Sequence, residues 1–381
     1  MRRRTLFWLT TLLFVVGLGV YASTGYLSAT GFVVRAAGMH GLARTLADAR
    51  TEPVQDSRLT IPWRGGTLPG RLYSPSKTSA RPILLVPGVH AAGVDEPRLD
   101  GFARNFAGMG HPVLSVGLPD LARYSVSPRT TDMIEDAARW WTAQHADTRN
   151  PTAIGIIGIS FGGGLSIVAA SRLPALGWVL SFGGHGDLPR TLRYLCTGDQ
   201  PDGSRRPPHD YGVAIILLGV AHRLVPAEQV EPLRTAILEF LNASHLDMSD
   251  KTKAAAVFEH ARTLASQLAE PARTLMGYVN TRDVAHLGPV LLPHVSALGG
   301  DPALSPERSS PPKAPVYLLH GMDDNVIPAV ESTLLSADLR RRGADAHLLI
   351  TPLITHAEVD RPPTLSEIWN LVRFWEELLS T

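Results

Sequence analysis

Short apolar runs alternate with longer helical patterns along this chain of 381 residues, and this alternation restricts the fold more than any other feature. The runs are too short for helices and rich in Val, Leu and Ile, so they predict buried strands. Strands that alternate with helices form a parallel sheet covered on both faces. Residues 58–73 add a hairpin turned at Gly65-Gly66. The expected strands are 83–86, 112–116, 152–159 and 178–182, and the helices between them are 95–109, 130–145 and 165–172.

The alternation stops at Gly183-Gly184 and returns after Pro312. No strand is evident at 185–312, where helical patterns occupy 211–224, 227–241, 251–268 and 283–298. Strand and helix patterns then resume at 316–320, 330–342, 346–351 and 365–379. We therefore expect an α/β core in two parts, with a helical block between them whose position favours a cap over a packing accessory. The predicted divisions are a connector at 35–51, core at 52–184, cap insertion at 185–312 and core at 313–381.

Ser160 lies in the segment GISFGG, where a predicted strand gives way to a helix. A side chain at such a junction is presented at the carboxyl edge of the sheet in a strained backbone conformation. Gly158 and Gly162 remove the Cβ atoms that would clash in so tight a bend. The pattern G-x-S-x-G is typical of a nucleophilic serine, but an ordinary glycine-rich turn has the same letters. The interpretation therefore depends on finding partners for Ser160.

Candidate partners follow two other predicted strands, because ligands of such sheets bind at the carboxyl ends of the strands. The strand at 316–320 ends in a turn that carries Asp323 and Asp324, and His356 follows the last strand. The order Ser160, Asp324, His356 is the chain order of the catalytic triad in the α/β-hydrolases.

The chain resembles the α/β-hydrolase superfamily and, within it, the dienelactone-hydrolase and prolyl-oligopeptidase-like branch. The resemblance covers about 52–184 and 313–381 and is carried by PGVHAAG at 87–93, GISFGG at 158–163, HGMDDNVIP at 320–328 and His356. It implies a mostly parallel sheet flanked by helices, with Ser160 as nucleophile, Asp324 as acid and His356 as base. The family pattern H-G-x-x-D-x-x-V/I-P places the acid at Asp324 and not at Asp323.

An oxyanion hole needs two fixed N–H donors. The residue after the nucleophile, Phe161, supplies one, and the resemblance implies Val89 for the other. Because Pro87 stands where the family often has histidine, Val89 and His90 remain alternatives. His90 and His185 also lie at strand ends, where we expect them either to line the pocket or to support the residues that contact the substrate.

The reaction implied is cleavage of a carboxylic ester or a related acyl substrate through an acyl-enzyme on Ser160. A peptidase, an acyltransferase or a catalytically silent binding module with the same fold are the alternatives. Ser160 stands where dienelactone hydrolases themselves have cysteine. We therefore do not expect this chain to have dienelactone hydrolase activity.

Composition excludes several other classes of function. The 36 basic and 35 acidic residues give a formal charge of +1 with no basic block, so nucleic-acid binding is not expected. Cys196 is the single cysteine, which excludes an internal disulfide and a cysteine-based metal cluster. No Walker A or H-E-x-x-H pattern is present, and the mechanism requires no cofactor or metal.

The amino-terminal residues 1–34 predict a membrane-inserted segment. Three arginines at positions 2–4 precede an uncharged stretch at 5–34, whose most apolar part at 6–22 is close to the length that crosses a bilayer. The arginines favour a cytoplasmic start, with the rest of the chain outside the cytoplasm. An uncleaved anchor is the main prediction, and export after signal cleavage near Ala22 is the alternative.

Overall fold

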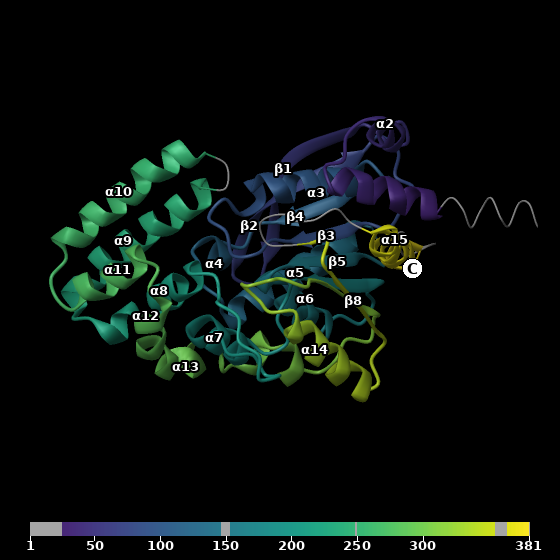
Figure 1. The fold of residues 1–381 in the computed structure, drawn as a ribbon. Coiled ribbons are helices and arrows are strands. Elements are labelled where there is room, and N and C mark those ends of the chain that lie inside the picture. The colour runs from purple at the N-terminus through teal and green to yellow at the C-terminus, as the bar shows by residue number, and fades with distance from the viewer. Residues whose placement is uncertain (1–24, 146–152, 248–249, 355–363, 381) are drawn as a thin grey trace, which may run out of the picture.

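The structure is a computed structural model that describes residues 25–145, 153–247, 250–354 and 364–380. Eight strands form one central sheet in the order β1-β2-β4-β3-β5-β6-β7-β8 (Figure 1). Strand β2 is antiparallel to both of its neighbours, β1 and β4, and every other pair is parallel. The strands are β1 (Val54–Trp63), β2 (Gly66–Pro75), β3 (Ile83–Val86), β4 (Val113–Val116), β5 (Gly155–Ile159), β6 (Trp178–Phe182), β7 (Val316–Gly321) and β8 (Ala346–Thr351).

Helices cover both faces of this sheet, which confirms the expected α/β-hydrolase architecture. The central strands are buried on both sides, and this is why they appear in the sequence as continuous apolar runs. One face packs against α3 (Pro97–Ala107), α15 (Leu365–Ser380) and a helix at residues 25–36. The other face packs against α5 (Pro128–Gln144), α6 (Phe161–Ala170) and α14 (Val330–Arg341).

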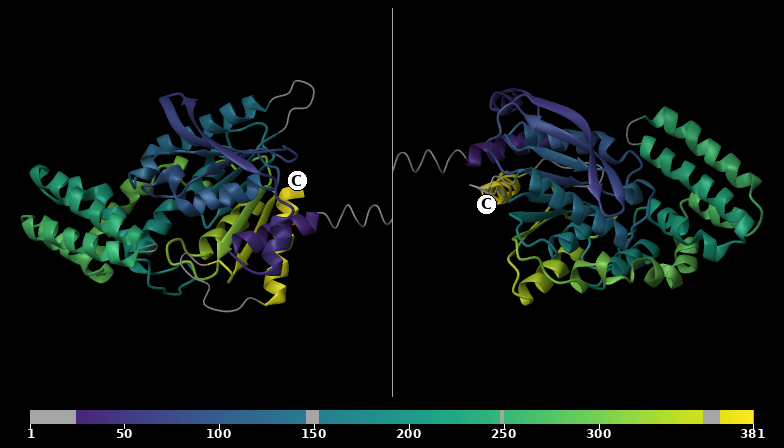
Figure 2. Two further views of the ribbon diagram at one scale, coloured as in Figure 1. Left: turned by 90° about the horizontal axis from the view of Figure 1, so that it is seen from above. Right: turned by 180° about the vertical axis from the view of Figure 1, so that it is seen from behind.

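A block of helices extends beyond one end of the sheet (Figures 1 and 2). The chain leaves the sheet after β6, forms this block and returns at β7, so the block is a single insertion. Its helices are α7 (Leu188–Thr197), α8 (Tyr211–Leu224), α9 (Ala227–Leu246), α10 (Lys251–Gln267), α11 (Ala272–Asn280), α12 (Val284–Leu291) and α13 (Val295–Gly299). Helices α7 and α11 were not expected, and the single helix expected at 283–298 is divided by a short 3₁₀ turn at Leu292–His294.

Charged groups fasten the insertion to the core at the point where it begins. Arg190 of α7 contacts Glu331 of α14 and Glu307, with N–O distances of 2.6 Å to each. Glu331 is 1% exposed and also accepts the backbone N–H groups of Gly186 and Asp187. A buried carboxylate with this many donors fixes the path of the chain as it leaves the sheet.

Part of the predicted membrane segment belongs to the folded core. In the helix at residues 25–36, Ala29, Phe32 and Val33 are buried, and the Phe32 ring lies 4.6 Å from the rings of both Phe106 and Trp375. Residues 1–24, including the predicted span at 6–22, lie outside the described residues. Within the described ranges, no helix combines the length and the apolarity needed to cross a bilayer.

Candidate active site

Ser160 occupies a sharp turn between β5 and α6. Its backbone has φ 54° and ψ −130°, a conformation that side-chain-bearing residues rarely adopt. Its N–H donates to the carbonyl of Phe182 on β6 at 2.8 Å, and its carbonyl accepts the N–H of Gly163 at 2.8 Å. Strained conformations of this kind persist only where the surroundings impose them, and they gather at active sites.

The two glycines of the motif are required by close packing around this turn. A Cβ on Gly158 would collide with the carbonyl oxygen of Gly162 and with Ser166, and a Cβ on Gly162 would collide with the carbonyl oxygen of Pro87. The loop after β3 therefore runs directly beside Ser160. A Cβ on Gly88 would lie 3.1 Å from the Cβ of Ser160, so substitution at this position would crowd the serine.

Asp324 lies in the turn after β7, at the same edge of the sheet. It is 3% exposed, and its Oδ1 accepts the N–H groups of Val326 at 2.8 Å and Ile327 at 2.9 Å. Its Oδ2 is 3.5 Å from Nε2 of the buried His320. These contacts hold the carboxylate in one orientation. Asp323, by contrast, is 63% exposed and pairs with Arg206 at 3.2 Å.

The ends of three adjacent strands bring Ser160 and Asp324 toward one another. Strand β6 lies between β5 and β7, and the register pairs Ile159 with Phe182 and Phe182 with Leu319. His356 belongs to the connection from β8 to α15 but lies outside the described residues, so its role stays a prediction.

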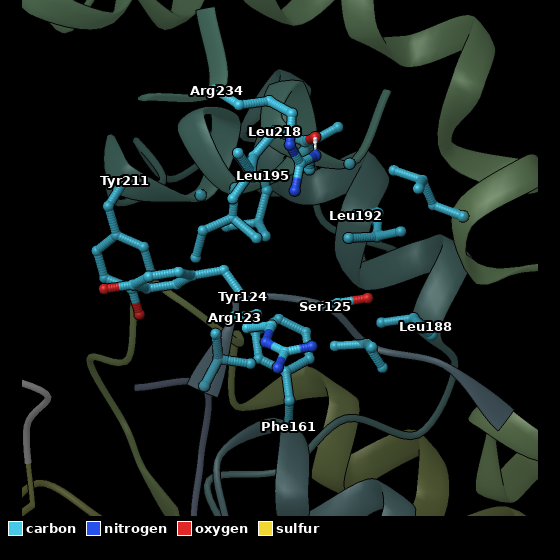
Figure 3. A pocket seen from close by; sticks show the side chains of 17 residues that line it. Arg123, Tyr124, Ser125, Phe161, Leu188, Leu192, Leu195, Tyr211, Leu218 and Arg234 are labelled. Carbon is cyan, nitrogen blue, oxygen red and sulfur yellow. Dashed lines mark hydrogen bonds between the residues drawn. The ribbon is translucent and has the colours of Figure 1, made fainter. Parts of the chain in front are cut away.

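A cavity of about 190 Å³ lies between the insertion and the core (Figure 3). Val89 and Phe161, the two expected oxyanion donors, both line it. Within the described part of the chain, the backbone N–H of neither residue donates to a backbone carbonyl. Most of the wall is apolar and comes from α7, α8 and the end of α13. These apolar lining residues are Leu188, Leu192, Leu195, Ile215, Ile216, Leu218 and Leu298.

Two tyrosines in this cavity were missed by the sequence analysis. Tyr124 has φ 58°, and its hydroxyl oxygen accepts the N–H of Ala91 in the loop beside Ser160. Burial raises the pKa of Tyr124. Burial and the nearby Asp324 carboxylate raise the pKa of Tyr211, at the start of α8. Tyr124 follows α4 (Pro119–Ala122) and not the end of a strand, so a search of strand ends would not have found it.

His185 is not among the residues that line the cavity, but its ring centroid lies 5.6 Å from that of Phe161, which does line it. Its ring is fully buried under α6, where Nε2 lies 2.8 Å from the carbonyl oxygen of Leu304 and a Cβ on Gly164 would collide with it. The imidazole fills the space that the glycine leaves open, so this histidine packs the base of the site.

His90 does not line the cavity either; it connects the core to the insertion. Its ring centroid lies 3.4 Å from that of His245 near the end of α9, and its Nδ1 accepts the N–H of Ala92. Burial, followed by the proximity of His245, lowers the pKa of His90 to about 4. Burial also lowers the pKa of His245, and the charged groups that face the pair are Glu96 and Arg98.

We expect this pair to make the protein less stable in acid. The unfolded chain takes up protons near the ordinary histidine pKa of 6.5, whereas folded His90 does so only near pH 4. The unfolded state therefore binds more protons in this interval, and the free energy of unfolding falls as pH falls from about 6.5 to 4. Thermal unfolding followed across this range should show a shallower decline for His245→Phe than for wild type. The exposed His40→Phe serves as the control, and equal pH slopes in all three proteins would contradict the expectation.

No protein-family model matches the chain, and no curated protein matches it in sequence. Solved structures do align with it. An esterase from the hyperthermophilic archaeon Pyrobaculum calidifontis is 17% identical, with a TM-score of 0.46, over 95% of this chain and 93% of that one. A bacterial heroin esterase is 16% identical, with a TM-score of 0.48, over 86% and 85%. Pyrococcus horikoshii acylaminoacyl peptidase is 13% identical, with a TM-score of 0.47, over 89% of this chain but 43% of the peptidase.

Proposed function

We propose that this protein is a serine hydrolase that cleaves a carboxylic ester through an acyl-enzyme on Ser160. The observation that carries the proposal is the backbone of Ser160 itself. A serine held at φ 54° between a buried strand and a helix, with glycines required on both sides, is costly to maintain. Such a turn displays Oγ at the edge of the sheet, and a packing role would not need the strain.

In the proposed reaction, His356 accepts the proton of Ser160 as Oγ attacks the ester carbonyl. Asp324 orients the imidazole and stabilises its charged form, a role that suits a carboxylate fixed by two backbone N–H groups. The backbone N–H groups of Phe161 and Val89 hold the developing oxyanion. The alcohol leaves with the proton from His356, and water then attacks the acyl-enzyme by the reverse of these roles.

Val89 is favoured over His90 as the second oxyanion donor because Val89 lines the cavity with Phe161, whereas His90 does not. The insertion and residues 123–126 of the core form the rest of the cavity wall. A mostly apolar wall strengthens hydrogen bonds to the oxyanion and selects the acyl group by its fit.

Labelling of the purified full-length protein with a fluorophosphonate probe tests the proposal without knowledge of the substrate. The probe reacts only with an activated serine, so we expect stoichiometric labelling that heat denaturation abolishes. Turnover of short p-nitrophenyl esters, compared with peptide amides and with transfer to an added alcohol, then separates an esterase from a peptidase or an acyltransferase. Absence of both labelling and turnover would favour the silent binding module.

The charge pattern at 1–34 supports the further proposal that the hydrolase is held at a membrane with its catalytic part outside the cytoplasm. Full-length protein should then remain with the membrane fraction after a high-salt wash and should be degraded by protease added to the outer side. A mature chain that begins near Ser23 would instead indicate export after cleavage. Full-length protein in the soluble fraction would contradict both forms.

A further inference from the structure

We propose that the cavity under the insertion binds an acyl chain that carries a negative charge, and that Arg234 is the residue that recognises this charge. The inference deepens the proposed function and rests on it, because it takes the scissile carbonyl to lie at Ser160. The chemical class of substrate is then the monoester of a dicarboxylic acid, with the free carboxylate directed into the cavity.

Among the described residues, the charged side chains that line the cavity are all of one sign. They are Arg123 and Arg234, and no Asp or Glu of the described ranges is among the lining residues. The whole chain is nearly balanced in charge, so this excess is local. Arg123 is exposed and the Arg234 side chain is 36% exposed, but both stand beside a mostly apolar wall. Such a wall screens the field of a cation less than water on every side would.

Arg234 is held in place by the insertion itself. It projects from α9, and its Nη1 donates to the carbonyl oxygen of Leu218 on α8 at 2.8 Å. Figure 3 shows the guanidinium among the side chains that surround the cavity. A guanidinium has five N–H donors, and this contact uses one of them, so the remaining donors can bind a ligand.

The acidic group nearest to Arg234 neutralises it only weakly. Glu231 Oε1 lies 3.6 Å from Nε, and the Glu231 side chain is 83% exposed. An ion pair this exposed to water contributes little to stability. Arg234 can therefore exchange Glu231 for a carboxylate that enters the cavity. A neutral acyl chain would occupy the same space without meeting the donors of Arg234, whereas a carboxylate can accept two parallel hydrogen bonds from it.

Arg123 adds a second positive charge from the core side of the cavity. It follows α4 (Pro119–Ala122) and immediately precedes Tyr124, whose hydroxyl contacts the loop beside Ser160. Within the described ranges, Arg123 has no ion pair with an acidic side chain. One cation therefore belongs to the insertion and one to the core, and the cavity lies between these two parts.

The test compares esters that differ only in charge. For the full-length protein, we expect kcat/KM to be higher for p-nitrophenyl monoesters of dicarboxylic acids, from succinate to adipate, than for neutral p-nitrophenyl alkanoates of equal length. In Arg234→Met, which keeps the stem and loses the charge, the ratio of the two should fall about tenfold to a hundredfold. Arg234→Lys should restore part of the ratio. The exposed Arg193→Met, on α7 but outside the cavity, should leave it unchanged.

A binding measurement separates this proposal from the proposed function. Ser160→Ala should still bind glutarate in isothermal titration, and binding should be lost when Arg234→Met is added. Hydrolysis of neutral esters without preference for the charged series would overturn the charge proposal and leave the serine hydrolase intact. Glutarate binding that depends on Arg234, in a protein that the fluorophosphonate does not label, would support the anion site and contradict the hydrolase. No binding and an unchanged ratio in Arg234→Met would overturn the inference.

Discussion

We expect Ser160→Ala to abolish fluorophosphonate labelling and to lower ester turnover by a factor on the order of 10⁶, as the removal of a nucleophile from a catalytic triad does. The fold should tolerate the change, because alanine has the Cβ of serine and meets the same strain at φ 54°. The melting temperature is therefore expected to stay near that of wild type. Labelling that persists in this variant would place the reactive serine elsewhere.

Ser160→Gly provides the matched control for strain. Glycine adopts positive φ without the cost that a Cβ imposes, so this variant should be equally inactive but more stable than wild type, by roughly 1 kcal/mol. Chemical denaturation of the three proteins measures the difference. A glycine variant less stable than the alanine variant would show that the turn is not strained.

Asp324→Asn should lower kcat by a factor on the order of 10⁴, because an amide in this place favours the wrong imidazole tautomer and carries no charge. Asp323→Asn is the matched control one residue away. Its side chain is exposed and contacts Arg206, so we expect an effect of less than threefold on kcat, in line with the small worth of surface ion pairs. Both variants are measured with the same neutral ester. The reverse order of effects would make Asp323 the orienting acid.

The parallel part of the sheet could be predicted from the sequence because its strands are buried on both faces. The predicted strands have the same bounds as β3 at 83–86 and β6 at 178–182, and the predicted helix at 211–224 has the same bounds as α8. The hairpin turn was misplaced by one position, since the register pairs Trp63 with Gly66 and leaves Arg64 and Gly65 at the turn. One-residue shifts of this kind are set by cross-strand pairing, which a local pattern does not contain.

Errors in the insertion have identifiable causes. Leu188, Leu192 and Leu195 have helical spacing, so α7 could have been recognised, although the glycines before it obscured its start. Pro293 interrupts the stretch predicted as one helix because it lacks an N–H and cannot continue the hydrogen-bond ladder.

The elbow and its glycines could be predicted, because chemistry fixes their spacing within a few residues. Arg234 and Tyr211 could not, since the packing of α8 and α9 against the core brings them to the cavity and nothing in their sequence neighbours marks them. The sequence alone does not assign residues 25–34, because an uncharged apolar segment suits a lipid and a protein interior equally well. The contacts of Phe32 with Phe106 and Trp375 place this part of the segment in the protein interior.

The insertion leaves the core near Gly186 and returns near Glu307, where the N–H of Glu307 donates to the carbonyl oxygen of Gly186 at 3.1 Å. Its two points of attachment therefore lie side by side, so a block of very different length or helix number could replace it without altering the sheet. In the proposed reaction, the chemistry takes place at β5, α6 and the turn after β7, whereas much of the cavity wall comes from the insertion. Mutations in the insertion can therefore change which substrate is accepted without altering the turn that holds Ser160. A protein engineer can exchange one insertion for another in the same way.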